Sequence, residues 1–167
     1  HGEPTILLDA GGNVEAKSEH LVDFAVFASV VLKEVYGVQK PMVGLINIGT
    51  EESKGRPLDV EAYEMLKSHP NINFYGNLEP KEILDSKCHV LLSDGFTANI
   101  VMKTMEGTAK ALGNVLKREI KKGFFSKLAA GLFLRKALTN FKKSLSADEV
   151  GGAMIAAFAS AKVLDGI

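Results

Sequence analysis

Short apolar runs bounded by turn-forming residues recur along the first part of the chain. Each run is three or four residues long, a length typical of buried strands. The runs are residues 6–8, 43–46, 72–75 and 90–92. The pattern therefore predicts β-strands at these four places.

Helical patterns separate the predicted strands. The first helix is expected to begin at Ser18 as its N-cap and to end before Gly37, and it is apolar nearly all round, which predicts packing on both sides. Further helices are expected at about 59–68, from about Pro80 over a short stretch, and at about 98–122. Because strand and helix alternate, the sequence predicts an α/β domain with a largely parallel sheet.

Polar, glycine-rich loops follow all four predicted strands. They are residues 9–13, 47–55, 76–77 and 93–99. In an open parallel sheet, such loops lie beyond the carboxyl ends of the strands, where ligands bind. Glycine lets the backbone approach an anion closely, and a helix N-terminus offers N–H groups to phosphate. The loops therefore predict an anion-binding site.

Particular residues in these loops suit that chemistry. Gly95, Thr97 and Asn99 open the last predicted helix, and Lys54 would supply positive charge. The alternative for any one loop is ordinary turn chemistry with a solvated lysine, and four loops at one edge favour a site. The P-loop pattern and the dinucleotide-binding glycine fingerprint are both absent, which argues against ATP or NAD bound in those ways.

Metal and nucleophile chemistry find no support in the sequence. The histidines lack metal-ligand spacing, and no nucleophile-elbow motif is present. His20 and His69 are expected at helix ends, Glu51 and Glu52 as exposed charge, and Cys88 in the core. The residues by themselves predict an anion-binding α/β domain without a metal.

Three of the loops closely resemble motifs of the PlsX family of phosphate acyltransferases. Residues 8–13 are similar to its strand-end motif D-x-G-A-N, with Gly12 in place of the alanine. Residues 47–55 match N-I-G-x-E-x-x-K-G. Residues 93–107 match D-G-F-x-G-N followed by K-x-x-E-G, with Ala98 in place of a common glycine. The order and spacing of the motifs hold over nearly the whole chain.

The resemblance implies a fold, an activity and partners. The fold would be isocitrate-dehydrogenase/phosphotransacetylase-like, in a homodimer. The activity would be transfer of a fatty acyl group from acyl carrier protein to inorganic phosphate, without a cofactor. The acyl phosphate would then serve the first acylation of glycerol 3-phosphate, so a glycerol-3-phosphate acyltransferase is an implied partner, and nucleic acid is not.

The resemblance also implies residue roles, carried over motif by motif. The implied catalytic residues are Lys54, Asn99 and Asp94. Lys54 would steady the phosphate charge, Asn99 would donate a hydrogen bond to the thioester oxygen, and Asp94 would orient these groups or accept a proton. The implied substrate contacts are Asn13, Thr50, Gly95 and Thr97. No covalent enzyme intermediate is needed, because phosphate is itself the nucleophile.

The net charge of zero hides a segregated distribution. Residues 117–143 carry nine lysines and arginines and one acid, whereas the rest of the chain carries eleven bases and nineteen acids. Phe124, Phe125 and Leu128 share a helical face among these lysines, which predicts a protruding, basic, amphipathic helical hairpin. Such a segment suits contact with an anionic membrane surface, and packing in a dimer interface is the alternative.

Length and composition favour one α/β domain over residues 1–167. A single cysteine and the lack of a membrane-spanning apolar run predict a cytoplasmic protein. The basic apolar segment and the family resemblance imply that it associates peripherally with membranes. The chain begins without methionine and is shorter than PlsX-family members, so it is expected to be their C-terminal half. The family places a buried strand and a His-Gly motif after residues 151–153, where this chain continues in a helical pattern.

Two other functions remain open at this point. One is a short-chain phosphotransacetylase that uses coenzyme A as the acyl carrier. The other is a non-catalytic module for dimerisation and membrane docking.

Overall fold

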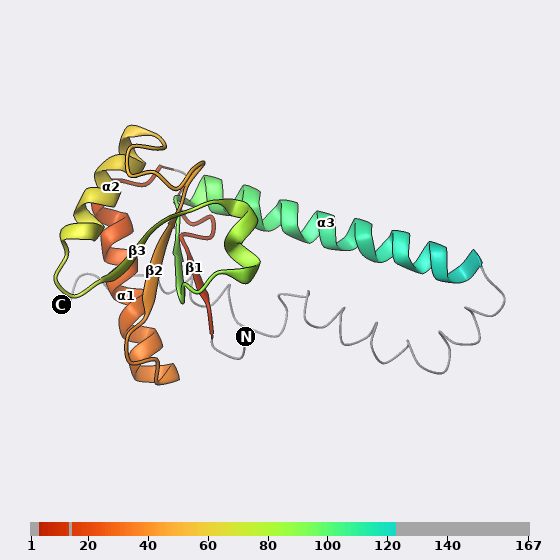
Figure 1. Cartoon of the computed structure of the whole chain (residues 1–167), viewed down its shortest axis with the longest axis horizontal. Coiled ribbons are helices and arrows are strands. Elements are labelled where there is room, and N and C mark those ends of the chain that lie inside the picture. Colours follow the sequence, from red (N-terminus) through yellow and green to blue (C-terminus); the bar gives the residue numbers. More distant parts are fainter. Residues whose placement is uncertain (1–3, 14, 123–167) are drawn as a thin grey trace. The chain divides into compact units, whose positions relative to one another are not determined.

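The computed structural model of the chain describes residues 4–13 and 15–122, and strands and helices alternate along them (Figure 1). The strands are β1 (Ile6–Leu8), β2 (Met42–Ile46), β3 (Asn73–Leu78) and β4 (Val90–Leu92). The helices are α1 (Ser18–Tyr36), α2 (Pro57–Ser68), the 3-10 helix η1 (Pro80–Asp85) and α3 (Gly95–Lys122). The predicted alternation is therefore confirmed.

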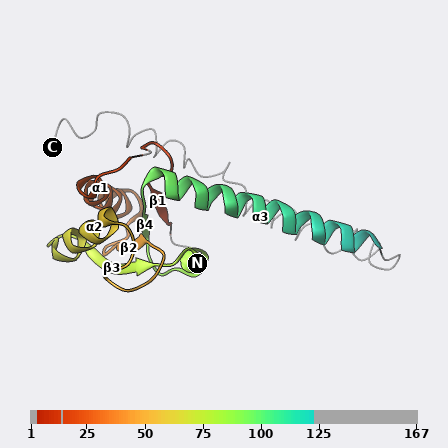
Figure 2. The same ribbon diagram turned by 90° about the horizontal axis from the view of Figure 1, so that it is seen from above.

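The four strands form one parallel sheet in the order β1-β4-β2-β3. Helices α1 and α2 lie side by side on one face of this sheet (Figures 1 and 2). The arrangement confirms the predicted α/β class. All four strands end at the same edge, because they run in the same direction.

Two compact units divide the chain. The described part of the first unit extends to Val101 and contains the sheet, α1, α2 and the first turns of α3. The second unit begins at Met102 and contains the remainder of α3. Residues 123–167 lie outside the described part of the chain, so the single-domain organisation and the hairpin over 117–143 stay predictions.

Apolar side chains on the two faces of the strands enter two clusters. Val43 and Leu45 of β2 join Leu92 of β4 in the larger cluster, which packs against α1 and α2. Ile46 and Leu91 lie in the smaller cluster on the other face. β2 and β4 are buried on both faces, and such strands need continuous apolar runs, which is why the runs at 43–46 and 90–92 identified them.

Helix α1 begins and ends through its own local chemistry. The imidazole nitrogen Nδ1 of His20 accepts a hydrogen bond from the Lys17 N–H at 3.3 Å. At the other end, Gly37 adopts the left-handed conformation with φ of 74° and donates to the Lys33 carbonyl at 3.2 Å. The Ser18 prediction was wrong, because its hydroxyl donates instead to Glu61 Oε2 of α2 at 2.6 Å.

Helix α1 was predicted to pack on both sides, and the structure differs from this prediction on one of them. Leu21, Ala28 and Leu32 are fully buried against the sheet. Val26 and Val30 lie on the opposite side and are exposed, Val30 by 53%. Among the described residues, α1 is therefore packed on one side only.

The largest error in the predicted elements concerns Gly76 and Asn77, which were expected in a loop. Both lie in β3, paired with Gly44 and Leu45 of β2 beyond an irregularity in the register. Gly76 has a φ of 118°, a conformation that glycine adopts without a steric penalty, so the strand continues through it. Asn77 is buried and holds the loop after β2.

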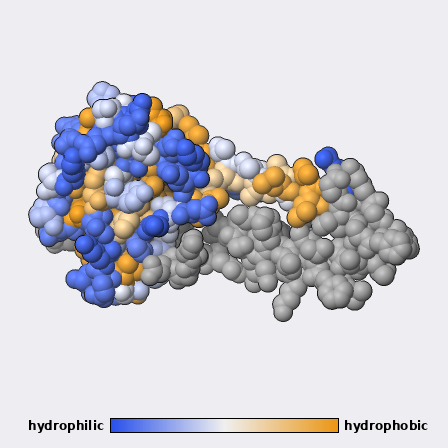
Figure 3. All heavy atoms as spheres, in the orientation of Figure 1, coloured by the Kyte–Doolittle hydropathy of each residue, from blue (hydrophilic) through white to orange (hydrophobic). Residues whose placement is uncertain are grey.

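Part of α3 belongs to the second unit and exposes an apolar stripe. Leu112, Val115 and Leu116 follow helical spacing and are exposed. Apolar colour is visible on the described part of α3 (Figure 3). No helix among the described residues is long and apolar enough to cross a bilayer.

Gly44→Ala is expected to lower the free energy of unfolding by about 1–3 kcal/mol, the usual cost of overpacking. A Cβ at this position would lie 2.5 Å from Leu78 Cδ1 and 2.9 Å from Cys88 Sγ. Urea unfolding followed by circular dichroism measures the change. Gly107→Ala is the matched control, because the new Cβ would meet nothing within 4 Å. This substitution should raise the free energy of unfolding by up to about 1 kcal/mol, since alanine has the higher helix propensity. Equal effects of the two substitutions would contradict the packing described for Gly44.

Candidate functional site

The loop after β1 is organised by a buried carboxylate. Asp9 is 4% exposed, and its two oxygens accept the N–H groups of Gly11 at 3.0 Å, Gly12 at 2.8 Å and Asn13 at 2.6 Å. Three donors compensate for the loss of water around the buried charge. The loop is therefore fixed from inside, and it leaves Asn13 exposed at the strand-end edge.

This first loop lies directly against the start of α3. The Gly95 N–H donates to the Asn13 carbonyl at 3.1 Å, and a Cβ at Gly95 would approach that oxygen to 2.5 Å. A Cβ at Gly11 would lie 3.1 Å from Asn99 Nδ2. The two loops therefore meet closely, with the Asn99 amide beside Gly11. Of the predicted residues, Asn13, Gly95 and Asn99 are brought together here.

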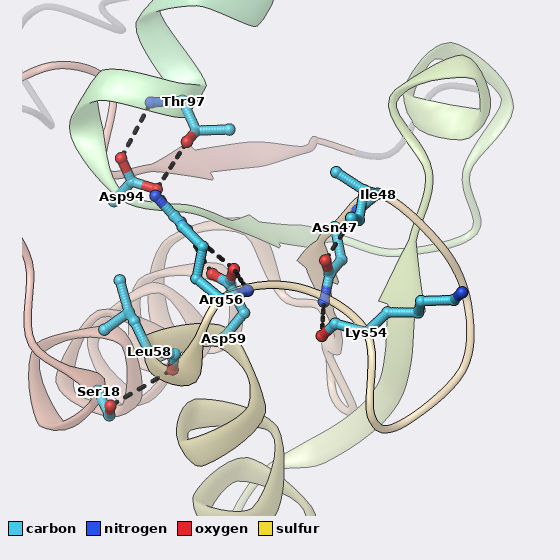
Figure 4. Close-up of polar contacts among 9 residues, drawn as sticks. All are labelled: Ser18, Asn47, Ile48, Lys54, Arg56, Leu58, Asp59, Asp94 and Thr97. Atoms are coloured by element: carbon cyan, nitrogen blue, oxygen red, sulfur yellow. Dashed lines mark hydrogen bonds and ion pairs between the residues drawn. The ribbon is translucent and has the colours of Figure 1, made fainter.

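Two buried amides hold the loop after β2. The Asn47 side chain donates from Nδ2 to the Lys54 carbonyl at 2.9 Å and accepts the Ile48 N–H at 2.8 Å (Figure 4). Asn77 of β3 donates to the Glu51 carbonyl at 2.8 Å. These bonds join both limbs of the loop to the sheet edge, so its backbone is well anchored.

The backbone of Lys54 is fixed by the hydrogen bond from Asn47, whereas its side chain extends toward solvent. The side chain is 47% exposed, and its Nζ lies 3.8 Å from Glu51 Oε1. Figure 4 shows it directed away from Arg56 and Asp94. Thr50 is also exposed on this loop. The fixed backbone and half-exposed side chain give Lys54 a defined origin with room to reach a ligand.

Glu52 joins the same loop to α2. Its carboxylate accepts hydrogen bonds from Lys67 Nζ at 2.9 Å and from the Tyr63 hydroxyl at 3.2 Å. The hydrogen bond from Lys67, followed by that from Tyr63, lowers the Glu52 pKa. Burial is the main cause that raises the pKa of Tyr63, and the hydrogen bond to Glu52 is the next. Glu51 and Glu52 are exposed carboxylates, as predicted.

Asp94 is the N-cap of α3. It is 2% exposed, its Oδ1 accepts the Thr97 N–H at 3.0 Å, and its Oδ2 accepts the Thr97 hydroxyl at 2.7 Å. The helix therefore begins at Gly95, earlier than predicted. The N–H groups of both Gly95 and Thr97 have acceptors within the chain, so they are not open donors for an anion.

Arg56 connects Asp94 to the start of α2, and sequence reasoning missed it. Its Nη2 lies 2.5 Å from Asp94 Oδ2 and 2.8 Å from Asp59 Oδ1, and its Nε lies 2.9 Å from Asp59 Oδ2 (Figure 4). The hydrogen bond to Asp59 is the main cause that raises the Arg56 pKa. Burial alone would raise the Asp94 pKa, but hydrogen bonds from Arg56 and Thr97 outweigh it and lower that pKa.

No feature of the sequence would have identified this contact. Asp59 is local to Arg56, but Asp94 is 38 residues away along the chain. The pairing depends on which strands are neighbours, and β2 lies beside β4 only in the folded sheet.

Among the described residues, no cluster of histidine, cysteine, aspartate and glutamate could hold a metal ion. Cys88 is buried, as predicted, and burial raises the pKa of its thiol. The predicted membrane contacts Phe124, Phe125 and Leu128 lie outside the described residues.

The fold and the site together define a parallel α/β domain whose strand-end edge carries the exposed side chains of Lys54, Asn13 and Asn99. Two buried carboxylates, Asp9 and Asp94, hold the loops there. A family model described as "Fatty acid synthesis protein" matches residues 1–165. The chain belongs to this family, the PlsX family that its loop motifs resemble.

Curated relatives named phosphate acyltransferase match most of the chain. The protein of Acholeplasma laidlawii is 71% identical over 93% of this chain and 46% of its own length. That of Aster yellows witches'-broom phytoplasma is 45% identical over 90% of this chain and 41% of its own length. That of Staphylococcus epidermidis is 40% identical over 92% of this chain and 47% of its own length. The chain therefore spans about half the length of the curated relatives it matches.

Arg56→Met is expected to destabilise the protein more at neutral than at acid pH. Because the Asp94 pKa is lowered in the folded state, the stability from its contacts is present above about pH 4, the ordinary aspartate value, and is lost as pH falls through the lowered value. Arg56→Met removes the Arg56 part of that contribution and leaves the two hydrogen bonds from Thr97. The difference in free energy of unfolding between variant and parent should therefore shrink below about pH 4.

Urea unfolding at neutral and acid pH measures this difference. Lys81→Met is the control, because Lys81 also pairs with a carboxylate, Glu79, but its side chain is 71% exposed, and such pairs contribute little. An effect of Arg56→Met that is the same at both pH values would contradict the assigned pKa shift of Asp94.

Proposed function

We propose that the full-length protein transfers a fatty acyl group from acyl carrier protein to inorganic phosphate, giving acyl phosphate. The observation that carries this proposal is the junction of the Asp9 loop with the first turn of α3, which sets the Asn99 amide beside Gly11. The relatives' name, phosphate acyltransferase, supports the same reaction.

The reaction needs a bound phosphate and a polarised thioester. A phosphate oxygen attacks the carbonyl carbon, the carbon–oxygen bond forms, and the carbon–sulfur bond breaks. The proton carried by phosphate ends on the sulfur of the departing carrier thiol. Charge therefore develops on the carbonyl oxygen, where a hydrogen-bond donor stabilises the transition state.

In this proposal, Lys54 binds the phosphate and Asn99 Nδ2 donates to the carbonyl oxygen. The half-exposed Lys54 side chain extends from a backbone fixed by Asn47, which supports a ligand-binding role. Asn13 and Thr50 are exposed on the neighbouring loops and would contact substrate. Gly95 and Thr97 serve through the backbone junction and the cap of α3.

Of the two roles expected for Asp94, orientation is the better supported. Both of its oxygens already accept hydrogen bonds from Thr97, and Arg56 donates to one of them. A general base needs a pKa near the working pH, and here the pKa is lowered. Asp94 therefore holds the first turn of α3, and with it Asn99, in place.

The further partners also belong to this proposal. A homodimer, a cytoplasmic location with peripheral contact to an anionic membrane, and delivery of acyl phosphate to a glycerol-3-phosphate acyltransferase rest on the family resemblance. For membrane contact, the basic and apolar composition of residues 117–143 is the support.

Lys54→Ala in the full-length protein is expected to abolish phosphate-dependent release of the carrier thiol without unfolding the protein. The substitution removes the cation that neutralises phosphate and leaves the backbone bond from Asn47 intact. Thiol release and circular dichroism are the measurements. Lys40→Ala is the matched control, because Lys40 is exposed and precedes β2 at the opposite end of the strand. A normal rate and phosphate dependence in Lys54→Ala would remove this lysine from the site.

Asn99→Ala is expected to lower kcat by about 10²-fold or more while changing KM little, because a donor to a developing oxyanion acts mainly in the transition state. Steady-state kinetics with acyl carrier protein thioesters measure both constants. Asn114→Ala, at an exposed position of the same helix, is the control and should retain full activity. A change in KM alone would show that the role given to Asn99 is wrong.

A further inference from the structure

Arg56 occupies an unusual position between two loops of the site. It lies two residues after Lys54 and directly before α2. Its backbone N–H donates to Asp59 Oδ2 at 2.8 Å, and its guanidinium reaches both Asp59 and Asp94 (Figure 4). One side chain therefore joins the end of the Lys54 loop to the N-cap of α3.

We propose that Arg56 is a positioning residue that sets the placement of Lys54 relative to Asn99. The inference rests on the proposed acyl transfer and deepens it. Arg56 does not contact the reacting atoms in this scheme. It acts through Asp94, whose carboxylate fixes the first turn of α3, and through its own backbone, which continues the Lys54 loop.

The contacts on each side of Arg56 leave little freedom between the two loops. On one side, the Lys54 carbonyl accepts a hydrogen bond from Asn47 at 2.9 Å, and a Cβ at Gly55 would approach Asn47 Oδ1 to 2.6 Å. On the other, Asp94 is held by Thr97. The Arg56 side chain joins these two parts, so its bond to Asp94 must break before the loop after β2 moves relative to the start of α3.

The guanidinium is suited to this task in a way that an ammonium is not. Its planar fork directs Nε and Nη2 to the two oxygens of Asp59, and the same Nη2 reaches Asp94. A lysine offers one point charge on a flexible stem and would not reproduce this geometry. Arg56→Lys is therefore expected to keep the charge and lose the relative placement of the loops.

Loss of placement has a kinetic signature. A misplacement of about 1 Å at a catalytic group costs on the order of 10²-fold in rate, because the reacting atoms must be aligned. A residue that bound phosphate directly would instead raise the KM for phosphate. A residue with only a general structural role would reduce the amount of folded protein and leave the constants of the folded fraction unchanged.

The experiment compares Arg56→Met and Arg56→Lys in the full-length protein. We expect kcat to fall by about 10²-fold in Arg56→Met and by nearly as much in Arg56→Lys. The KM for phosphate should change by less than about threefold in both variants. Ala28→Gly is the matched control. Ala28 is fully buried in α1 and makes no polar side-chain contact, so the substitution should lower stability through helix propensity and packing without lowering kcat.

A double-mutant cycle provides the second readout. If Arg56 acts by placing Asn99, then Arg56→Met should cost much less in an Asn99→Ala protein than in the parent, because there is no longer a donor to misplace. Amide hydrogen exchange in Arg56→Met should also become faster at Lys54 and Thr97 than in the core strands. A general loss of stability would instead speed exchange throughout the protein and would leave the losses with Asn99→Ala additive.

Several outcomes would overturn the inference. A parent-like kcat in both Arg56 variants, a raised KM for phosphate with kcat unchanged, or fully additive losses with Asn99→Ala would each do so while leaving the proposed function intact. Absence of phosphate-dependent thiol release from the parent protein would instead remove the proposed function, and the inference with it.

Discussion

The buried carboxylate of Asp94 is the group on which the strand-end edge of this structure depends. A negative charge with 2% exposure is stable there only because donors surround it, and they come from two different parts of the chain. Thr97 supplies two donors from α3, and Arg56 supplies a third from the start of α2. The need to satisfy one charge therefore joins the loop after β2 to the helix after β4.

Buried polar groups fix the remaining loops by the same principle. Asp9 binds three N–H groups of its own loop, and Asn47 and Asn77 bind carbonyls of the next. Each of these side chains lies at or just beyond the end of its strand and is largely removed from water. The loops that carry the candidate site are consequently ordered by interior contacts, and their exposed side chains remain available for a ligand.

Local signals predicted most of the fold. Apolar runs located the strands, and the αL glycine at position 37 ended α1 at the predicted place. The errors arose where a residue's partner is distant. Ser18 looked like a cap, but its hydroxyl bonds Glu61, and Asn77 looked like a turn residue, but β2 pairs with it. The loop motifs indicated Lys54, Asn99 and Asp94, whereas the role of Arg56 required knowledge that β2 lies beside β4.

The exposure of the candidate catalytic side chains sets a condition on the proposed chemistry. Lys54 is 47% exposed and Asn99 is also exposed, so in this arrangement their interactions with a charged substrate are screened by water. A donor to an oxyanion is far more effective where water is excluded. On the proposed function, the exclusion of water must come from groups beyond the described residues, either other parts of the full-length protein or the acyl substrate itself. The described loops would then supply the aligned polar groups, and the covering surface would supply the low dielectric that makes them effective.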